Sequence, residues 1–147
     1  MVPLDGVWDI AEGSRQQVPS QFLSKVPVPG LVTSAKPFFE GGGEENKIRE
    51  VFWYCKKFKI AGRIPALARL KIFKSMFGTK VFLNGKEVGE SALNFTPLYF
   101  NVTPFLKGNS EEYELLIRIG AHIAAVPYSV VFGGDPERHL SCNCFLL

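Results

Sequence analysis

The residues best suited to chemistry gather near the end of the chain, where His139, Cys142 and Cys144 fall within six positions. Thiolates and imidazole are the ligands that Zn²⁺ prefers, but a structural zinc site needs four ligands. The sequence supplies no complete set at suitable spacing, so we predict incidental thiols and no metal site. The third cysteine, Cys55, lies inside an apolar strand pattern and is predicted to be a buried thiol.

Nucleophilic hydrolysis and phosphate binding find little support. His122 and His139 are the only histidines, and no serine lies in a G-x-S-x-G turn. The glycine-rich stretch 40–46 lacks both the G-x-G-x-x-G spacing and the Lys-Ser/Thr end of a P-loop. We therefore predict a flexible loop there, and no cofactor.

Length and composition indicate one folded domain over residues 1–147, because 46% of the 147 residues are hydrophobic and 21% are charged. The net charge of +3 comes without a dense Lys/Arg patch, which argues against nucleic-acid binding. No apolar run approaches the roughly 20 residues that span a bilayer, so no membrane partner is expected. The start of the chain lacks a basic and apolar leader, which fits either a cytoplasmic location or a periplasmic or secreted protein whose leader was removed.

The sequence predicts short strands separated by turns, and these strands would position any functional site. Strands are predicted at 7–10, 51–60, 67–74, 98–102 and 112–119, and an edge strand near 142–147. In 51–60 the apolar side chains Phe52, Tyr54 and Phe58 share one face, whereas Trp53 lies on the face of Lys57. Both faces of this strand are therefore expected to be partly covered. The stretch 11–47 is long, polar and proline-rich, and its residues 26–30 are expected to have an extended backbone.

Turn residues fix two further features. Asn84-Gly85 between apolar runs predicts a tight hairpin over 80–88, because both residues tolerate the positive φ of a type I′ turn. Thr103 is expected to cap a short turn at 104–106. This succession of short strands and tight turns indicates an all-β antiparallel β-sandwich.

The order of several motifs resembles a known family. Leu4-Asp5-Gly6-Val7-Trp8 is followed by Val28-Pro29-Gly30, by the Trp53-Tyr54 strand, by Val81-Phe82-Leu83-Asn84-Gly85 with Val88-Gly89, by Asn101-Val102-Thr103 and by the strand ending at Ile119. This ordered set resembles the N-terminal sugar-binding domain of glycoside hydrolase family 2, which includes β-galactosidases, β-glucuronidases and β-mannosidases. The resemblance implies a jelly-roll sandwich of the galactose-binding type. It also implies that the catalytic TIM barrel of such enzymes lies outside this chain.

The resemblance directs attention to Asp135-Pro136-Glu137-Arg138. Some β-galactosidases of the family carry an Asp-x-x-Arg segment late in this domain, and the Asp of that segment reaches the sugar pocket of the adjoining barrel. Asp135 would accept hydrogen bonds from sugar hydroxyls, Arg138 would hold that carboxylate, and Glu137 lies beside them. A solvated turn is the alternative. Trp53 is a further sugar-stacking candidate, with core packing as its alternative.

Paired carboxyls about 5–5.5 Å apart would be required for retaining glycoside hydrolysis, and the acidic residues fall mostly in loops. We therefore predict a non-catalytic carbohydrate-binding and scaffold domain of a glycoside hydrolase acting on β-glycosides, which lends a loop to a barrel domain. The alternatives are a free-standing carbohydrate-binding module and a protein-interaction sandwich without a sugar site. The expected partners are carbohydrate and the barrel, and an uncovered barrel-facing surface would favour a homo-oligomer.

Overall fold

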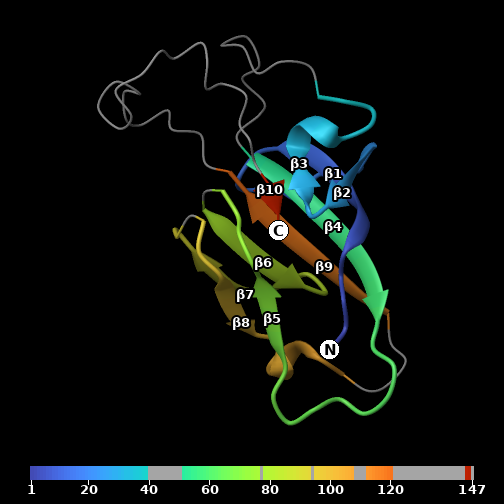
Figure 1. Cartoon of the computed structure of the whole chain (residues 1–147), viewed down its shortest axis with the longest axis vertical. Helices are drawn as coiled ribbons and strands as arrows, with labels where there is room; N and C mark the ends of the chain where they lie inside the picture. Colours follow the sequence, from blue (N-terminus) through green and yellow to red (C-terminus); the bar gives the residue numbers. More distant parts are fainter. Residues whose placement is uncertain (40–50, 77, 94, 108–111, 121–144, 147) are drawn as a thin grey trace.

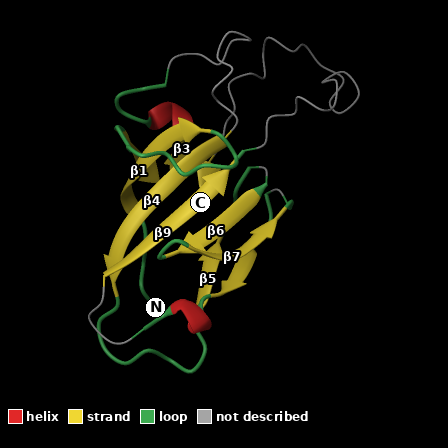
Figure 2. Cartoon of the chain, turned by 180° about the vertical axis from the view of Figure 1, so that it is seen from behind, coloured by secondary structure: helices red, strands yellow, loops and turns green. Residues whose placement is uncertain are grey.

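The computed structural model describes residues 1–39, 51–76, 78–93, 95–107, 112–120 and 145–146. Its strands are β1 (Gly6–Gly13), β2 (Ser24–Val28), β3 (Gly30–Leu31), β4 (Val51–Lys59), β5 (Arg69–Ile72), β6 (Thr79–Leu83), β7 (Lys86–Ser91), β8 (Leu98–Asn101), β9 (Glu112–Ile119) and β10 (Phe145–Leu146). Two single-turn 3₁₀ helices, η1 (Val32–Ser34) and η2 (Thr103–Phe105), complete the regular structure of these residues. Strands dominate from either side of the molecule (Figure 2).

The strands form one large sheet and two small ones (Figure 1). The large sheet has the order β2-β1-β4-β9-β6-β7, and β5 pairs with β8 while β3 pairs with β10. Every strand pair is antiparallel, and most neighbours in the large sheet are distant in sequence. The predicted all-β antiparallel sandwich with jelly-roll, galactose-binding-like architecture is confirmed.

The core lies between the sheets. Tyr54 on β4 is in register with Ile117 on β9, which is in register with Val81 on β6, and all three are buried. Ile72 and Leu98 from β5 and β8 join the same cluster from the opposite layer. Period-two alternation thus places one face of each strand in the core, as the sequence predicted for 51–60 and 112–119.

The outer face of the large sheet is also partly covered. Trp53 and Cys55 point away from the Tyr54 face, yet both are buried. Leu116, an apolar exception on the polar side of its strand, is in register with Cys55 and is buried as well. The expectation that both faces of β4 are partly covered is confirmed.

The Asn-Gly hairpin is confirmed between β6 and β7. Asn84 has φ 50° and Gly85 has φ 73°, as a type I′ turn requires. The Asn84 side chain also accepts a hydrogen bond from the backbone N–H of Glu114 at 2.8 Å, and its own N–H donates to the Glu114 carbonyl at 2.9 Å. The turn is therefore fastened to the neighbouring strand β9.

The extended backbone expected within 26–30 is confirmed, because β2 adds to the edge of the large sheet beside β1 and is followed by β3 and η1. One local prediction needs correction. Thr103 does not cap η2, whose N-cap is Val102 without a side-chain cap. The Thr103 hydroxyl instead accepts from the Ala68 N–H at 2.8 Å and joins η2 to the segment before β5.

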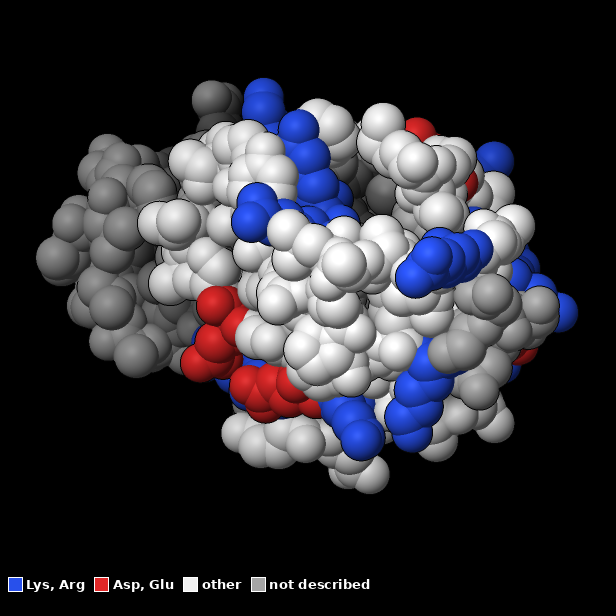
Figure 3. All heavy atoms as spheres, turned by 90° about the horizontal axis from the view of Figure 1, so that it is seen from below, with Lys and Arg blue, Asp and Glu red and all other residues white. Residues whose placement is uncertain are grey.

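Charges are dispersed over the surface. Figure 3 shows Lys and Arg at several separate places on one face, whereas the largest group of Asp and Glu lies at one side of it and smaller acidic spots lie at the opposite edge. Among the described residues, the structure contains no helix long and apolar enough to cross a membrane. The predicted loop at 40–46 and the cysteines at 142 and 144 lie outside the described residues.

Candidate functional site

Three of the four predicted sugar-binding residues, Asp135, Glu137 and Arg138, lie outside the described residues. Their role stays a prediction. The structure does fix the two ends of the segment that carries them. The segment follows β9, which pairs with β4 in the large sheet. It precedes β10, which pairs with β3 in a separate small sheet.

Trp53 is described and is 2% exposed. Its indole N–H donates to the Ser14 carbonyl at 3.0 Å, and its ring centroid lies 5.6 Å from that of Phe82. A ring that stacks on a sugar must present a face to solvent, so this burial favours the core-packing alternative. Tyr54 is fully buried in the core between the sheets.

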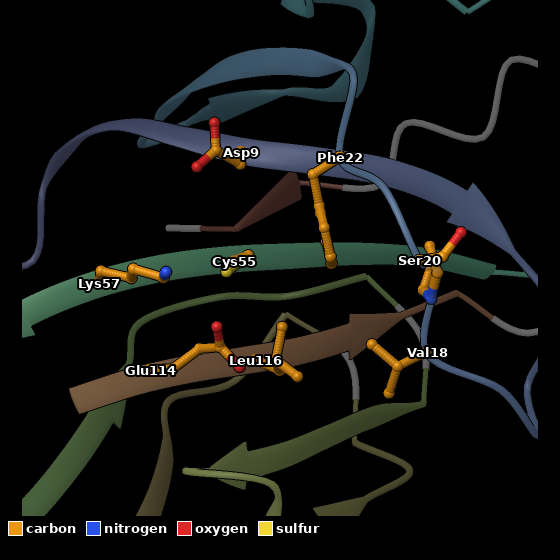
Figure 4. A pocket seen from close by; sticks show the side chains of 9 residues that line it. Asp9, Val18, Ser20, Phe22, Cys55, Lys57, Glu114 and Leu116 are labelled. Atoms are coloured by element: carbon orange, nitrogen blue, oxygen red, sulfur yellow. The ribbon is translucent and has the colours of Figure 1, made fainter.

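A hollow lies on the outer face of the large sheet, beneath the segment that joins β1 to β2 (Figure 4). Its volume is about 400 Å³. Strands β1, β4 and β9 form the floor, and residues 18–20 with Phe22 form the cover. The lining residues are Asp9, Val18, Pro19, Ser20, Phe22, Cys55, Lys57, Glu114 and Leu116.

The charges around the hollow follow strand register. Asp9 on β1 is in register with Cys55 on β4, and Lys57 on β4 is in register with Glu114 on β9. Asp9 also pairs with Lys25 at 2.8 Å, with 44% of its side chain exposed. The hollow therefore combines carboxylates, an ammonium group and the Phe22 ring, which are groups that bind polyhydroxylated ligands.

The two carboxylates of the hollow come from different strands and are not directly opposite each other. Asp9 and Glu114 lie on strands either side of β4 and two residues out of register, so their Cα atoms are roughly 12 Å apart. Retaining glycosidases hold the two carboxyls about 5–5.5 Å apart. Within the described part of the chain, moreover, no three His, Cys, Asp or Glu side chains gather as metal ligands would.

Cys55 forms part of the floor and is confirmed as a buried free thiol. Burial raises the pKa of Cys55 to about 11, and the carboxylates of Glu114 and Asp9 add to the rise while Lys57 opposes it. The thiol is therefore protonated near neutral pH and is a poor nucleophile. It contributes apolar surface to the hollow and no covalent chemistry.

Sequence reasoning did not identify this hollow. Lys57 and Glu114 were recognisable only as outward positions of alternating strands. Asp9 meets them through the pairing of β1 with β4, and Phe22 meets them because the segment after β1, which has no periodic pattern, folds back over the sheet. Only the apolar residues Trp53 and Leu116 on otherwise polar faces indicated that something covers the sheet.

The chain is similar to parts of several larger glycoside hydrolases. No family model matches the chain. The chain is 33% identical over 90 residues to a β-galactosidase of Thermoanaerobacter pseudethanolicus, a match that covers 60% of the chain and 12% of that protein.

Solved structures agree. A β-D-mannosidase of Dictyoglomus thermophilum matches 80% of the chain with a TM-score of 0.60 and 25% identity, over 15% of its own length. A β-glucuronidase of Faecalibacterium prausnitzii matches 81% with a TM-score of 0.60 and 22% identity, over 20% of its length. The chain thus spans a fifth or less of these proteins. Its resemblance to the sugar-binding domain of glycoside hydrolase family 2 is confirmed, both in the matched sequence and in the jelly-roll sandwich that the strands form.

Proposed function

We propose that residues 1–147 form a non-catalytic carbohydrate-binding and scaffold domain of a glycoside hydrolase that acts on β-glycosides. The single observation that carries the proposal is the similarity of the sandwich to part of a β-mannosidase and part of a β-glucuronidase, together with the sequence match to a β-galactosidase. All three names describe enzymes that act on β-linked sugars. The mixed charged and aromatic lining of the hollow supports a binding role for this chain.

The finer part of the proposal concerns the segment between β9 and β10. We propose that Asp135 accepts hydrogen bonds from substrate hydroxyls in the pocket of an adjoining barrel, and that Arg138 holds its carboxylate. Glu137 is the second acceptor of this segment. The support is that the residues on either side of the segment lie in paired strands, β9 with β4 and β10 with β3.

The active-site contribution is tested in the enzyme that carries this domain. Asp135→Ala should raise KM for a chromogenic β-glycoside by roughly tenfold or more, since a charge-assisted hydrogen bond contributes about 1.5–3 kcal/mol. Asp5→Ala, at an exposed position near the N-terminus, is the matched control. Unchanged KM and kcat in Asp135→Ala would remove the contribution of this segment.

A second candidate function, a carbohydrate-binding module that acts by itself, is favoured by the hollow. The isolated chain is titrated with methyl β-galactoside, β-mannoside and β-glucuronide at millimolar concentration, and amide shifts are followed by NMR. Shifts of Cys55, Lys57 and Glu114 would support binding in the hollow. If none of the sugars moves any amide, a protein-interaction sandwich becomes the better description. Turnover of chromogenic glycosides by the pure chain would contradict the non-catalytic role.

A further inference from the structure

The small β5–β8 sheet presents an outer face distinct from the hollow. Lys71 on β5 is in register with Tyr99 on β8, and the next pair on the same face is Arg69 with Asn101. All four of these residues are exposed. Their strand neighbours Ile72 and Leu98 point the other way into the core, so the outward face is rigidly backed.

An ammonium group and two aromatic rings meet on this face. The Lys71 Nζ lies 3.9 Å from the ring centroid of Phe73 and 5.7 Å from that of Tyr99. Both rings are 57% exposed, which is unusual for aromatic side chains. The contact with Phe73 limits the positions of the flexible lysine and holds its charge beside the Tyr99 ring.

The charge of this region has one sign. The described residues in 67–76 and 91–101 include Arg69, Lys71 and Lys74 but neither Asp nor Glu. A third exposed aromatic, Phe95, lies beside the end of β5, since its N–H donates to the Ser75 carbonyl at 3.1 Å. A ligand that complements this face therefore carries negative charge and a flat apolar surface.

We propose that the outer face of β5–β8 binds an acidic pyranose, such as a uronic acid residue of a glycan. The apolar C–H face of the sugar ring stacks on Tyr99, and its carboxylate pairs with Lys71 and Arg69. The inference rests on the proposed function, because the enzymes similar to this chain act on sugars. An acidic peptide has the same charge but no ring that stacks in this way, so the sugar fits the aromatic platform better.

The test compares methyl β-D-glucuronide with its neutral counterpart, methyl β-D-glucoside, by NMR titration of the full chain in low salt. The glucuronide should shift the amides of residues 69–73 and 98–101 and should bind at least about threefold more tightly than the glucoside there. Added salt should weaken this binding. Equal affinity for the two sugars, or no shift in these strands, would overturn the inference.

Variants separate ring stacking from charge. Tyr99→Leu should weaken glucuronide binding by about threefold to tenfold, whereas Tyr99→Phe should keep it, because the ring carries the contact. Lys71→Met should weaken it by about twofold to fivefold. Phe38→Ala and Lys59→Met, at exposed positions on other elements, should have no effect. An unchanged affinity in both Tyr99→Leu and Lys71→Met would contradict the site.

The outcomes distinguish the inference from the function on which it rests. If glycosides shift amides in the hollow or in the Asp135 segment but leave β5 and β8 unchanged, this inference fails and the carbohydrate-binding function stands. If no glycoside binds anywhere, both fail. If a hexaglutamate peptide displaces the glucuronide and binds more tightly, the face is a protein-binding surface and the inference is overturned.

Discussion

Trp53 and Arg118 lie opposite each other on β4 and β9 and donate hydrogen bonds to consecutive carbonyls of one loop. The indole Nε1 of Trp53 donates to Ser14 at 3.0 Å, and the Nη1 of Arg118 donates to Arg15 at 2.7 Å. These two bonds hold the segment after β1 against the outer face of the sheet. The same segment then supplies the cover of the hollow, so this pair connects the packing of the sheet to the candidate site.

Trp53→Phe should therefore loosen the cover as well as the sheet. It removes the indole donor and leaves the Ser14 carbonyl without that partner, at an expected cost of about 2 kcal/mol in the free energy of unfolding. Hydrogen exchange of residues 14–20 should accelerate. Trp8→Phe is a matched control, because the Trp8 indole donates to the Leu4 carbonyl at 2.7 Å elsewhere on the sheet. Exchange in 14–20 that responds no more to Trp53→Phe than to Trp8→Phe would contradict the role of the pair.

Arg118→Met should loosen the loop after β1 while leaving the free energy of unfolding nearly unchanged. Burial lowers the pKa of Arg118, with Glu90 opposing this shift, and among the described residues none accepts a hydrogen bond from its Nε. Methionine keeps the apolar stem and removes a charge that is costly to bury, so unfolding free energy should change by less than about 1 kcal/mol. Exchange of the amides after Arg15 should still accelerate. A loss of several kcal/mol in urea denaturation would show that the guanidinium stabilises the fold on balance.

The sheet was predictable from sequence because its information is local. Alternation in 51–60 and 112–119 gave the inward and outward faces of β4 and β9, and Asn84-Gly85 gave the hairpin. Positive φ at two adjacent positions strongly restricts residue type, so the Asn-Gly dipeptide is enough to predict this turn.

The hollow was not predictable because its parts are brought together by long-range pairing. Asp9, Lys57 and Glu114 come from three strands far apart in sequence, and Phe22 comes from a segment without periodicity. Trp53 shows the same limit, since its position on a polar face suited both a sugar platform and a second packed surface. Only the fold of the covering loop decides between the two.

Asn84 should tolerate aspartate better than alanine. Alanine loses the acceptor for the Glu114 N–H and must adopt φ 50°, so Asn84→Ala should destabilise the fold by about 2 kcal/mol. Asp keeps a side-chain acceptor and enters the left-handed region more readily, so Asn84→Asp should cost less than half of that. Thermal denaturation of the two variants gives the comparison. Equal losses would contradict the prediction that the acceptor and the left-handed preference retained by aspartate preserve stability.

Gly30 occupies a position where a side chain does not fit. A Cβ added there would run into the carbonyl oxygen of Pro27, a backbone atom that cannot move aside without shifting β2. Gly30→Ala should therefore cost about 2–3 kcal/mol, measured by urea denaturation. Gly85→Ala meets open space and should cost only about 1 kcal/mol through its positive φ. The reverse order of the two losses would contradict the close approach.

Cys55 should make stability depend on alkaline pH. Burial raises the pKa of this thiol from its usual 9.0 to about 11, with Glu114 and Asp9 contributing. Below pH 9 the thiol is protonated in both folded and unfolded chains, so it adds no pH dependence. Between pH 9 and about 11 only the unfolded chain loses the proton, so the unfolding free energy should fall as pH rises, by at most about 3 kcal/mol.

The measurement uses the Cys142→Ser/Cys144→Ser background, in which Cys55 is the only thiol. Urea denaturation from pH 8 to 11 gives the stability curve, and iodoacetamide labelling of the folded chain should be slow until the pH approaches 11. Adding Cys55→Ala removes the titrating group and should flatten that part of the curve, whatever constant loss its smaller side chain causes. Because the two carboxylates that raise the pKa line the hollow, a ligand that neutralises them should also lower the pH at which labelling accelerates. Fast labelling at pH 8 would show instead that the thiol is reached by solvent and that the loop after β1 does not cover it.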